Sequence, residues 1–327
     1  MKASVINPVL DPQRSEDRTR DHNVSKVKIS VVIPTYNEQN SIEACLASLA
    51  KQTIAKKMEI IVVDDGSTDG SEFKIQKAKL QFKIQNLILL KQGHGGPGEA
   101  RNLGASKASG EVMVFVDADM EFEPDFVEKL LAPIVCGKAV GTYSTQEYLL
   151  NKDKPLARCW NRNFGRSVDK METRGYAQKA SGLYLVAKNC LEKIEGKKAD
   201  EQKNRVFRAI LKSEFAKAGG FDTGVGYTDD WSISQKLNIF PVSVDDAVYF
   251  HRSPDNFSEI WRQARWFGKN DFLTRNIIRK LFNLWRYFPP WSIFYLYDPT
   301  LFAFKCVFNT AVFISVVLSF FGEHKAR

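Results

Sequence analysis

The chain has 327 residues, of which 44% are hydrophobic and 12% aromatic, and its formal net charge is +9. This length and composition suffice for one large or two ordinary domains with a buried core, which excludes a disordered chain. The positive charge favours an anionic partner, such as a phosphorylated small molecule, nucleic acid or an acidic lipid surface, without choosing among them.

The first 27 residues lack the apolar run of a secretory signal, and we expect a disordered tail there. The five cysteines form no C-x-x-C pair and show no metal-ligand spacing, so we expect buried or incidental thiols in a reducing compartment.

From residue 28 onward, apolar β-branched runs alternate with helical patterns. Strands are predicted over KISVVIP (28–34), EIIVVDDGS (59–67), NLILL (86–90) and EVMVFVDAD (111–119), with helices over 41–53, 71–82 and 97–108 between them. This order predicts an α/β fold with a doubly wound, mostly parallel sheet flanked by helices. Farther along we expect loops over 143–179, a strand near 183–187 and a helix that ends at AGGFD (218–222).

Parallel sheets of this kind bind ligands beyond the carboxyl ends of their strands. Those ends carry four polar clusters: PTYNE (34–38), DDGSTD (64–69), the glycine loop KQGHGGPGEARN (91–102) and DADME (117–121). We therefore expect all four clusters to converge on one edge of the sheet.

The glycine loop contains a literal G-x-G-x-x-G at Gly93, Gly95 and Gly98, which would suggest an NAD-dependent oxidoreductase. In such enzymes the fingerprint follows the first strand, whereas here it follows the third, so the match is interpreted as a coincidence. We expect the glycines to let the backbone pass close to a bound nucleotide. Pro97 can start a helix whose positive end faces an anion.

Asp117 and Asp119 follow a buried strand with one residue between them. A turn at the strand end would let both carboxylates reach one hard divalent cation, which prefers oxygen ligands. Taken alone, a D-x-D of this kind is as often a structural cap.

Taken together, KISVVIPTYNE, EIIVVDDGSTDGS, GPGEARN and FVDAD resemble the nucleotide-sugar half of the family 2 glycosyltransferases, which are inverting enzymes of GT-A fold. The resemblance is close over 28–119 and looser over 181–266. It implies that Pro34, Tyr36 and Glu38 surround the nucleobase, with the Tyr36 ring available for stacking. Asp65 stands where the family accepts a hydrogen bond from the base.

The same resemblance implies that Gly98 and Arg101 bind the nucleotide sugar. It makes Asp117 a ligand on the ribose or metal side, and Asp119 the principal ligand of Mn²⁺ or Mg²⁺. His251 matches a histidine that some relatives use as a third metal ligand, although a lone histidine more often serves packing or hydrogen bonding.

Asp229 and Asp230 open an apolar helical pattern, where carboxylates are also ordinary N-terminal caps. In the family an acidic pair at this position supplies the general base, which implies Asp230 as the base and Asp229 as its support. RQARW (262–266) resembles the QxxRW of processive synthases, with Arg in place of the leading Gln. Arg265 could then neutralise the leaving diphosphate and Trp266 could stack on the acceptor sugar, but a helix docked on a membrane also favours these residue types.

The C-terminal block is strongly apolar. LFAFKCVFNTAVFISVVLSFF (301–321) is long enough to span a bilayer, and the aromatic segment 281–299 before it resembles an interfacial belt. A buried core helix or hairpin is the alternative. Arg275, Arg279, Lys280 and Arg286 precede the block and favour a cytoplasmic catalytic domain at the cell membrane, although Lys325 and Arg327 weaken this assignment.

The predicted organisation is a tail over 1–27 and a GT-A catalytic domain over 28–255. Residues 28–120 form its nucleotide-sugar half and 121–255 its acceptor half. Interfacial helices follow over 256–298 and a transmembrane helix with a short tail over 299–327.

The predicted activity is metal-dependent, inverting transfer of a hexosyl or N-acetylhexosaminyl group. The donor is a nucleotide sugar, with a UDP-sugar expected, and the acceptor is a hydroxyl of a lipid-linked saccharide or polysaccharide. A polyprenyl (dolichyl) phosphate sugar transferase is the alternative within the family. An NAD-binding oxidoreductase or a non-catalytic membrane module are more distant ones. Nucleic acid is not an expected partner, because the positive charge is dispersed.

Overall fold

The computed structural model describes residues 27–164, 206–223, 229–268 and 277–321. The chain divides into two compact units. The first, here called the sheet unit, comprises Met1–Gln146, Gln202–Thr223 and Asp230–Tyr249. The second, here called the helical unit, comprises Glu147–Glu201, Gly224–Asp229 and Phe250–Arg327. The tail over 1–26 and the strand predicted near 183–187 lie outside the described residues.

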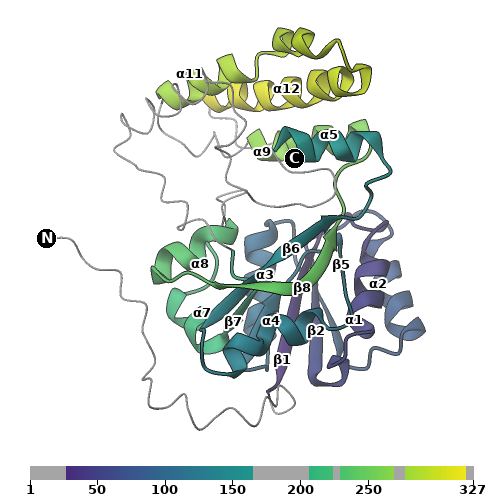
Figure 1. Cartoon of the computed structure of the whole chain (residues 1–327), viewed down its shortest axis with the longest axis vertical. Helices are drawn as coiled ribbons and strands as arrows, with labels where there is room; N and C mark the ends of the chain where they lie inside the picture. The colour runs from purple at the N-terminus through teal and green to yellow at the C-terminus, as the bar shows by residue number, and fades with distance from the viewer. Residues whose placement is uncertain (1–26, 165–205, 224–228, 269–276, 322–327) are drawn as a thin grey trace, which may run out of the picture. The chain divides into compact units, whose positions relative to one another are not determined.

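Four parallel strands begin the sheet, as the alternation of strands and helices predicts (Figure 1). They are β1 (Ile29–Thr35), β2 (Met58–Asp64), β3 (Leu87–Lys91) and β4 (Val112–Phe115). β1 lies between β2 and β4, and β3 pairs with β2. The continuous apolar runs of β1, β2 and β4 fit strands that are buried on both faces, whereas β3 lies at the sheet edge and is mostly partly exposed.

Four more strands complete an eight-stranded sheet within the described residues, in the order β3-β2-β1-β4-β7-β6-β8-β5. They are β5 (Met120–Phe122), β6 (Gly141–Leu149), β7 (Ala209–Leu211) and β8 (Val242–His251). β7 runs antiparallel to both β4 and β6. The prediction of loops over 143–179 was wrong for 143–149, which belong to β6, and for 155–163, which form a helix. β6 mixes polar and apolar residues and lacks the apolar run of a buried parallel strand.

Helices cover both faces of the sheet (Figure 1). The short turn η3 (Ala55–Lys57) precedes β2, and the helices of this part of the chain are α1 (Ile42–Ala50), α2 (Ser71–Gln81), α3 (Pro97–Lys107), α4 (Phe126–Val135), α7 (Lys212–Ala218) and α8 (Asp229–Leu237). Two hydrophobic clusters form, and alternate residues of β1 enter different clusters: Val31 and Ile33 the first, Val32 the second. α3 packs closely on the sheet at Gly104, where an added Cβ would lie 2.4 Å from Cγ1 of Val32. α7 ends at Ala218 with Gly219 as its C-cap, as predicted from AGGFD.

The helical unit contains α5 (Pro155–Asn163), α9 (Phe257–Gly268), α11 (Ile277–Arg286), the 3₁₀ segment η6 (Pro289–Tyr295) and α12 (Pro299–Phe320). Their shared core includes Trp160, Ile260, Phe304 and Phe308. Among the described residues, α12 is the one helix with the length and mean hydropathy (2.1) for crossing a membrane, and 44% of its apolar window is buried inside the structure.

Candidate functional site

The loops after β1 and β2 are bound to each other by backbone and side-chain hydrogen bonds. The amide of Asn37 donates to Oγ of Ser67 over 2.9 Å, and Oδ1 of Asn37 accepts from the amide of Thr68 over 2.9 Å. The amide of Glu38 donates to Oγ of Ser71 over 2.8 Å. Two of the four predicted polar clusters therefore form one rigid edge.

Asp65 ties the glycine loop to the same edge. Its side chain is almost fully buried, and its carboxylate accepts hydrogen bonds from the amides of Gly95 and Gly96, each over 2.8 Å. Nε2 of Gln92 donates to it over 2.7 Å, and Nδ1 of His94 lies 2.9 Å from Oδ2. In this structure Asp65 thus organises the loop, and its hydrogen bond to a nucleobase stays a prediction.

Asp64, by contrast, accepts from the amide of Ser67 over 2.9 Å and shapes its own turn.

The glycine loop uses its glycines for backbone conformation. Gly96 has φ 97° and ψ 168°, a region that is essentially restricted to glycine, and it precedes Pro97 at the first turn of α3. Gly98 is buried one residue later. The anion at this helix start is the carboxylate of Asp65. A nucleotide phosphate near this helix end is a prediction that the structure does not test.

Tyr36 carries the predicted stacking surface for a base. Its exposed ring stacks on the imidazole of His94, with centroids 4.1 Å apart and planes at 24°. Pro34 is partly buried at the end of β1, and Oε2 of Glu38 accepts from Oγ of Ser41 over 2.5 Å. His94 thus contacts both Tyr36 and Asp65, the two residues predicted to hold the base.

The chain turns immediately after β4. A turn at this place is what would let the carboxylates of Asp117 and Asp119 reach one cation. The amide of Met120 donates to the carbonyl of Asp117 over 3.3 Å, which closes a turn through Asp119. Cys45 lies beneath this turn, and its thiol donates to the Asp117 carbonyl over 3.7 Å. Burial raises the pKa of Cys45 well above its usual value, and the negative charges of Asp119 and Asp117 raise it further. Both carboxylates therefore contribute to one negative field at the sheet edge.

Arg101 joins two of the predicted functional carboxylates. Its guanidinium is buried, with NH2 2.7 Å from Oδ1 of Asp117 and NH1 2.5 Å from Oδ1 of Asp230. The ring of Phe221 lies beneath it, 5.6 Å from Cζ. Residues predicted from α3, from the end of β4 and from the start of α8 thus form one ion-pair network.

Arg208 is a site residue that the sequence analysis missed. It lies just before β7, and its NH1 is 3.1 Å from Oδ2 of Asp117. Its guanidinium also lies over the ring of Tyr249, 5.8 Å from the centroid. The segment VFRAIL carries no recognisable motif, and the antiparallel pairing of β7 that brings Arg208 to the site was not predicted.

Asp230 lies in the first turn of α8, and its side chain is partly exposed. Asp229 is the first residue of α8, which fits the capping interpretation as well as the catalytic one. Thr228, the first residue of the predicted acidic motif, lies outside the described residues.

The other three predicted site residues, His251, Arg265 and Trp266, belong to the helical unit. His251 ends β8, and its Nδ1 lies 2.8 Å from Oε1 of Glu147, a partner that the sequence analysis did not identify. A metal bond from this imidazole would therefore have to use Nε2. Arg265 and Trp266 lie near the end of α9, and burial lowers the pKa of Arg265.

Carboxylate oxygens suit Mn²⁺ and Mg²⁺, and the turn at Asp117 and Asp119 fits such a cation chemically. Within the described ranges, no group of three or more His, Cys, Asp or Glu side chains is close enough together to hold a metal ion. The ligand set Asp117, Asp119 and His251 remains a prediction.

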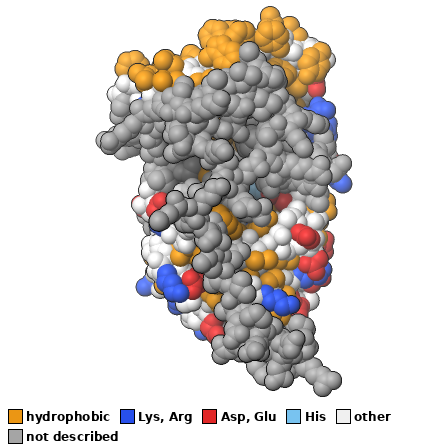
Figure 2. Space-filling view, turned by 60° about the vertical axis from the view of Figure 1, so that its left-hand side comes forward, with side chains coloured by type: hydrophobic (Ala, Val, Ile, Leu, Met, Phe, Trp, Pro, Cys, Tyr) orange, Lys and Arg blue, Asp and Glu red, His pale blue; other side chains and the backbone are white. Residues whose placement is uncertain are grey.

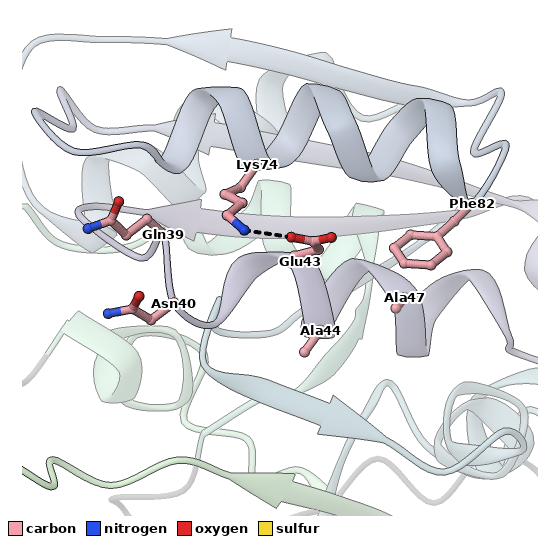
Figure 3. Close-up of a pocket in the computed structure, with 7 residues that line it drawn as sticks. All are labelled: Gln39, Asn40, Glu43, Ala44, Ala47, Lys74 and Phe82. Atoms are coloured by element: carbon pink, nitrogen blue, oxygen red, sulfur yellow. Dashed lines mark hydrogen bonds and ion pairs between the residues drawn. The ribbon is translucent and has the colours of Figure 1, made fainter.

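A pocket of about 420 Å³ lies between α1 and α2 (Figure 3). Its charged groups pair with each other: Glu43 bonds Lys74 over 2.9 Å and Lys77 over 2.8 Å. Hydrogen bonds from Lys77 and Lys74 lower the pKa of Glu43. This pocket is interpreted as a helix-packing feature.

Comparison with known proteins supports the resemblance seen in the motifs. Residues 30–182 match the model of the family described as glycosyl transferase family 2. Glycosyltransferase GlyA of Streptococcus pneumoniae is 40% identical over 120 residues, which are 36% of this chain and 17% of GlyA. Poly(ribitol-phosphate) beta-N-acetylglucosaminyltransferase TarS of Staphylococcus aureus is 41% identical over 106 residues, 32% of this chain and 17% of TarS. The aligned segment is thus less than a fifth of either relative.

Crystal structures of S. aureus TarS 1–349 share the fold. The complex with UDP has a TM-score of 0.51 at 17% identity and covers 92% of this chain and 93% of that one. The complex with UDP-GlcNAc has a TM-score of 0.50 at 18% identity and covers 76% and 68%, respectively.

Proposed function

Because residues 30–182 match the glycosyl transferase family 2 model and the chain shares the fold of TarS, we propose that it transfers one sugar from a nucleotide donor to an acceptor hydroxyl with inversion. The observation that supports this most is the network Asp117–Arg101–Asp230. In this network Arg101, the predicted nucleotide-contacting arginine, contacts both Asp230, the predicted general base, and Asp117, a predicted metal ligand.

The proposed donor is a UDP-sugar. The TarS structures that share the fold were solved with UDP and with UDP-GlcNAc. In this chain, Tyr36 offers an exposed ring for stacking on the base. The acceptor we propose is a lipid-linked saccharide or a polysaccharide.

The proposed reaction is a single displacement at the anomeric carbon. Asp230 accepts the proton of the acceptor hydroxyl while that oxygen bonds to the anomeric carbon. The bond from this carbon to the diphosphate oxygen breaks, and the electron pair leaves with the nucleoside diphosphate. Attack from the face opposite the leaving group inverts the carbon.

Positive charge near Asp117 would stabilise the leaving group. Arg101 and Arg208 supply two guanidinium groups there. We propose that Asp119, with Asp117, would hold Mn²⁺ or Mg²⁺, which would offset negative charge on the departing diphosphate.

The test is release of nucleoside diphosphate by the purified chain with a panel of nucleotide sugars, with Mn²⁺ or Mg²⁺, and with hydroxyl acceptors or dolichyl phosphate. Asp230→Asn should lower kcat by about 10²–10⁴-fold, since general-base catalysis contributes that much. Asp119→Ala should lower turnover by at least about 100-fold if it holds the metal. Asp153→Asn, an exposed carboxylate of the helical unit, is the control and should leave the rate unchanged.

Near wild-type rates for Asp230→Asn would remove its role as base. Transfer to dolichyl phosphate alone would replace this proposal with the polyprenyl-phosphate alternative. Unchanged melting temperatures would show that lost turnover is not unfolding.

A further inference from the structure

The apolar C-terminal block divides into one buried helix and one exposed surface. From residue 301 to 319, every side chain of α12 is buried or partly buried. The segments before it are different: Leu281 is 54% exposed, Ile293 59% and Phe294 68%. Much of the apolar surface available to a partner therefore belongs to α11 and η6. Hydrophobic side chains gather at this end of the helical unit (Figure 2).

α12 is held by polar helices of its own unit. It packs against α9 and α5 as well as η6 and α11. α9 approaches so closely that a Cβ on Gly268 would lie 2.6 Å from Cβ of Ser315. An α12 that spanned a bilayer in this arrangement would carry α9 and α5 into hydrocarbon, together with Arg262 and Arg162, whose side chains are exposed. Charged side chains there are costly, so this packing disfavours a span.

Polar groups of α12 are also satisfied inside the unit. Nζ of Lys305 donates to Oδ1 of Asn163 over 2.6 Å, and Nδ2 of Asn309 donates to Oγ of Ser292 over 3.3 Å. These bonds fit a core helix, in which neighbours of the same unit supply the partners.

The exposed surface has the composition of a membrane interface. Ring contacts run from Trp285 to Trp291 and from Trp291 to Phe288 and Phe294, and Nε1 of Trp291 donates to the carbonyl of Trp285 over 2.7 Å. Tryptophan and phenylalanine are favoured where hydrocarbon meets headgroups.

The positive charge of the segment that carries this surface favours anionic lipids. Between residues 277 and 297 the sequence has three basic residues, Arg279, Lys280 and Arg286, and no Asp or Glu. Each basic residue near an anionic bilayer surface contributes about 1 kcal/mol to binding.

We propose that α11 and η6 dock the chain onto the surface of an anionic bilayer, with α12 remaining a core helix that does not cross it. The docking surface consists of Leu281, Trp285, Phe288, Trp291, Ile293 and Phe294. Docking of this kind places the chain on one leaflet, and the anionic cytoplasmic leaflet of a cell membrane is the surface that its charge fits. The proposal does not depend on the reaction proposed above.

The first experiment is flotation of the full chain with vesicles of phosphatidylcholine alone or mixed with phosphatidylglycerol. We expect binding to the anionic vesicles, weaker binding to neutral ones, and release as salt rises. Leu281→Ser with Phe294→Ser should lower the partition coefficient by at least about tenfold, because both side chains lose apolar contact with the bilayer. The control pair is Phe73→Ser with Leu80→Ser on α2, at 69% and 80% exposure, and should bind like the wild type.

The second experiment separates docking from spanning. Docked chain should be extracted from the vesicles by alkaline carbonate, and tags at both termini should be digested by protease added outside. Resistance to carbonate with protection of one tag would overturn the proposal. Failure of the chain to bind anionic vesicles would also overturn the proposal. It would be overturned in the same way if the chain failed to bind vesicles and Leu281→Ser with Phe294→Ser abolished a dimer, because the surface would then bind a second copy of the chain. Circular dichroism of each variant shows whether it is folded.

Discussion

At the scale of single residues, Arg101 determines how the candidate site is assembled. It is buried, yet it contacts two carboxylates from segments far apart in the sequence, Asp117 and Asp230. A planar guanidinium can serve two carboxylates at once, whereas an ammonium is a single point charge. The geometry of the site therefore depends on the fork of the arginine as well as on its charge.

Arg101→Lys should lower kcat/KM for the donor by at least about 100-fold and reduce the free energy of unfolding by about 1–3 kcal/mol, because a single ammonium at this buried position can pair with only one of the two partly exposed carboxylates. Steady-state kinetics and urea unfolding measure the two effects. Arg252→Lys is a matched control, since Arg252 also contacts two carboxylates, Asp255 and Glu259, within the helical unit. Equal kinetic losses in both variants would contradict a special role for Arg101.

The sequence predicted Asp117, Arg101 and Asp230 because each lies in a motif at a strand end or helix start, and the structure brings these three together. It did not predict Arg208, His94 or Glu147, whose partners are set by strand pairing and loop packing. Such partners depend on long-range geometry that local patterns do not record.

At the scale of elements, the glycine loop is fixed by one backbone conformation. Gly96 adopts a φ and ψ that side chains disfavour, which turns its amide toward Asp65. Gly93, three residues earlier, has open space where a Cβ would lie and no positive φ.

Gly96→Ala should therefore reduce the free energy of unfolding by about 1–3 kcal/mol through backbone strain. Gly93→Ala is the matched control and should change stability by less than about 0.5 kcal/mol. Urea unfolding of both variants provides the comparison. Equal free energies of unfolding for Gly96→Ala and Gly93→Ala would contradict this prediction, because the loop could then change its conformation without its hydrogen bond to Asp65.

Elements with a continuous apolar run were predictable, and those without one were not. β1 and β2 lie within a residue or so of their predicted starts, because burial on both faces demands apolar side chains throughout. β6 and β7 were missed because one mixes polar and apolar side chains and the other has only three residues. The motif clusters follow the predictable strands, which is why most of the site was found.

At the scale of the whole molecule, acid stability depends on carboxylates that the fold holds ionised. Glu59 accepts hydrogen bonds from Oγ of Ser30 over 2.5 Å and from the amide of Ser109 over 2.6 Å, so it connects the strand β2 to β1 and to the turn before β4. Burial acts to raise the pKa of Glu59, but the hydrogen bonds from Ser30 and Ser109 outweigh it, and the pKa is lowered. A lowered folded-state pKa stabilises the protein above the unfolded value, and this contribution disappears as pH falls through the folded value.

Glu59→Gln should reduce the free energy of unfolding by about 1–2 kcal/mol at pH 7 and by progressively less below about pH 4.5, where the wild-type carboxylate also loses its charge. Urea unfolding across this pH range tests whether the free energies of unfolding of Glu59→Gln and the wild type converge as the pH falls. Glu123→Gln, at an exposed position, should follow the wild type at every pH. A constant difference between Glu59→Gln and wild type down to pH 3 would refute the assignment.

The pairing of Asp117 with both Arg101 and Arg208 has a consequence for the resting protein. The carboxylate charge of Asp117 is compensated within the protein by two guanidinium groups. Under the proposed function, an incoming diphosphate would recruit these two guanidinium groups, and donor capture would be an exchange of partners within a preformed cluster.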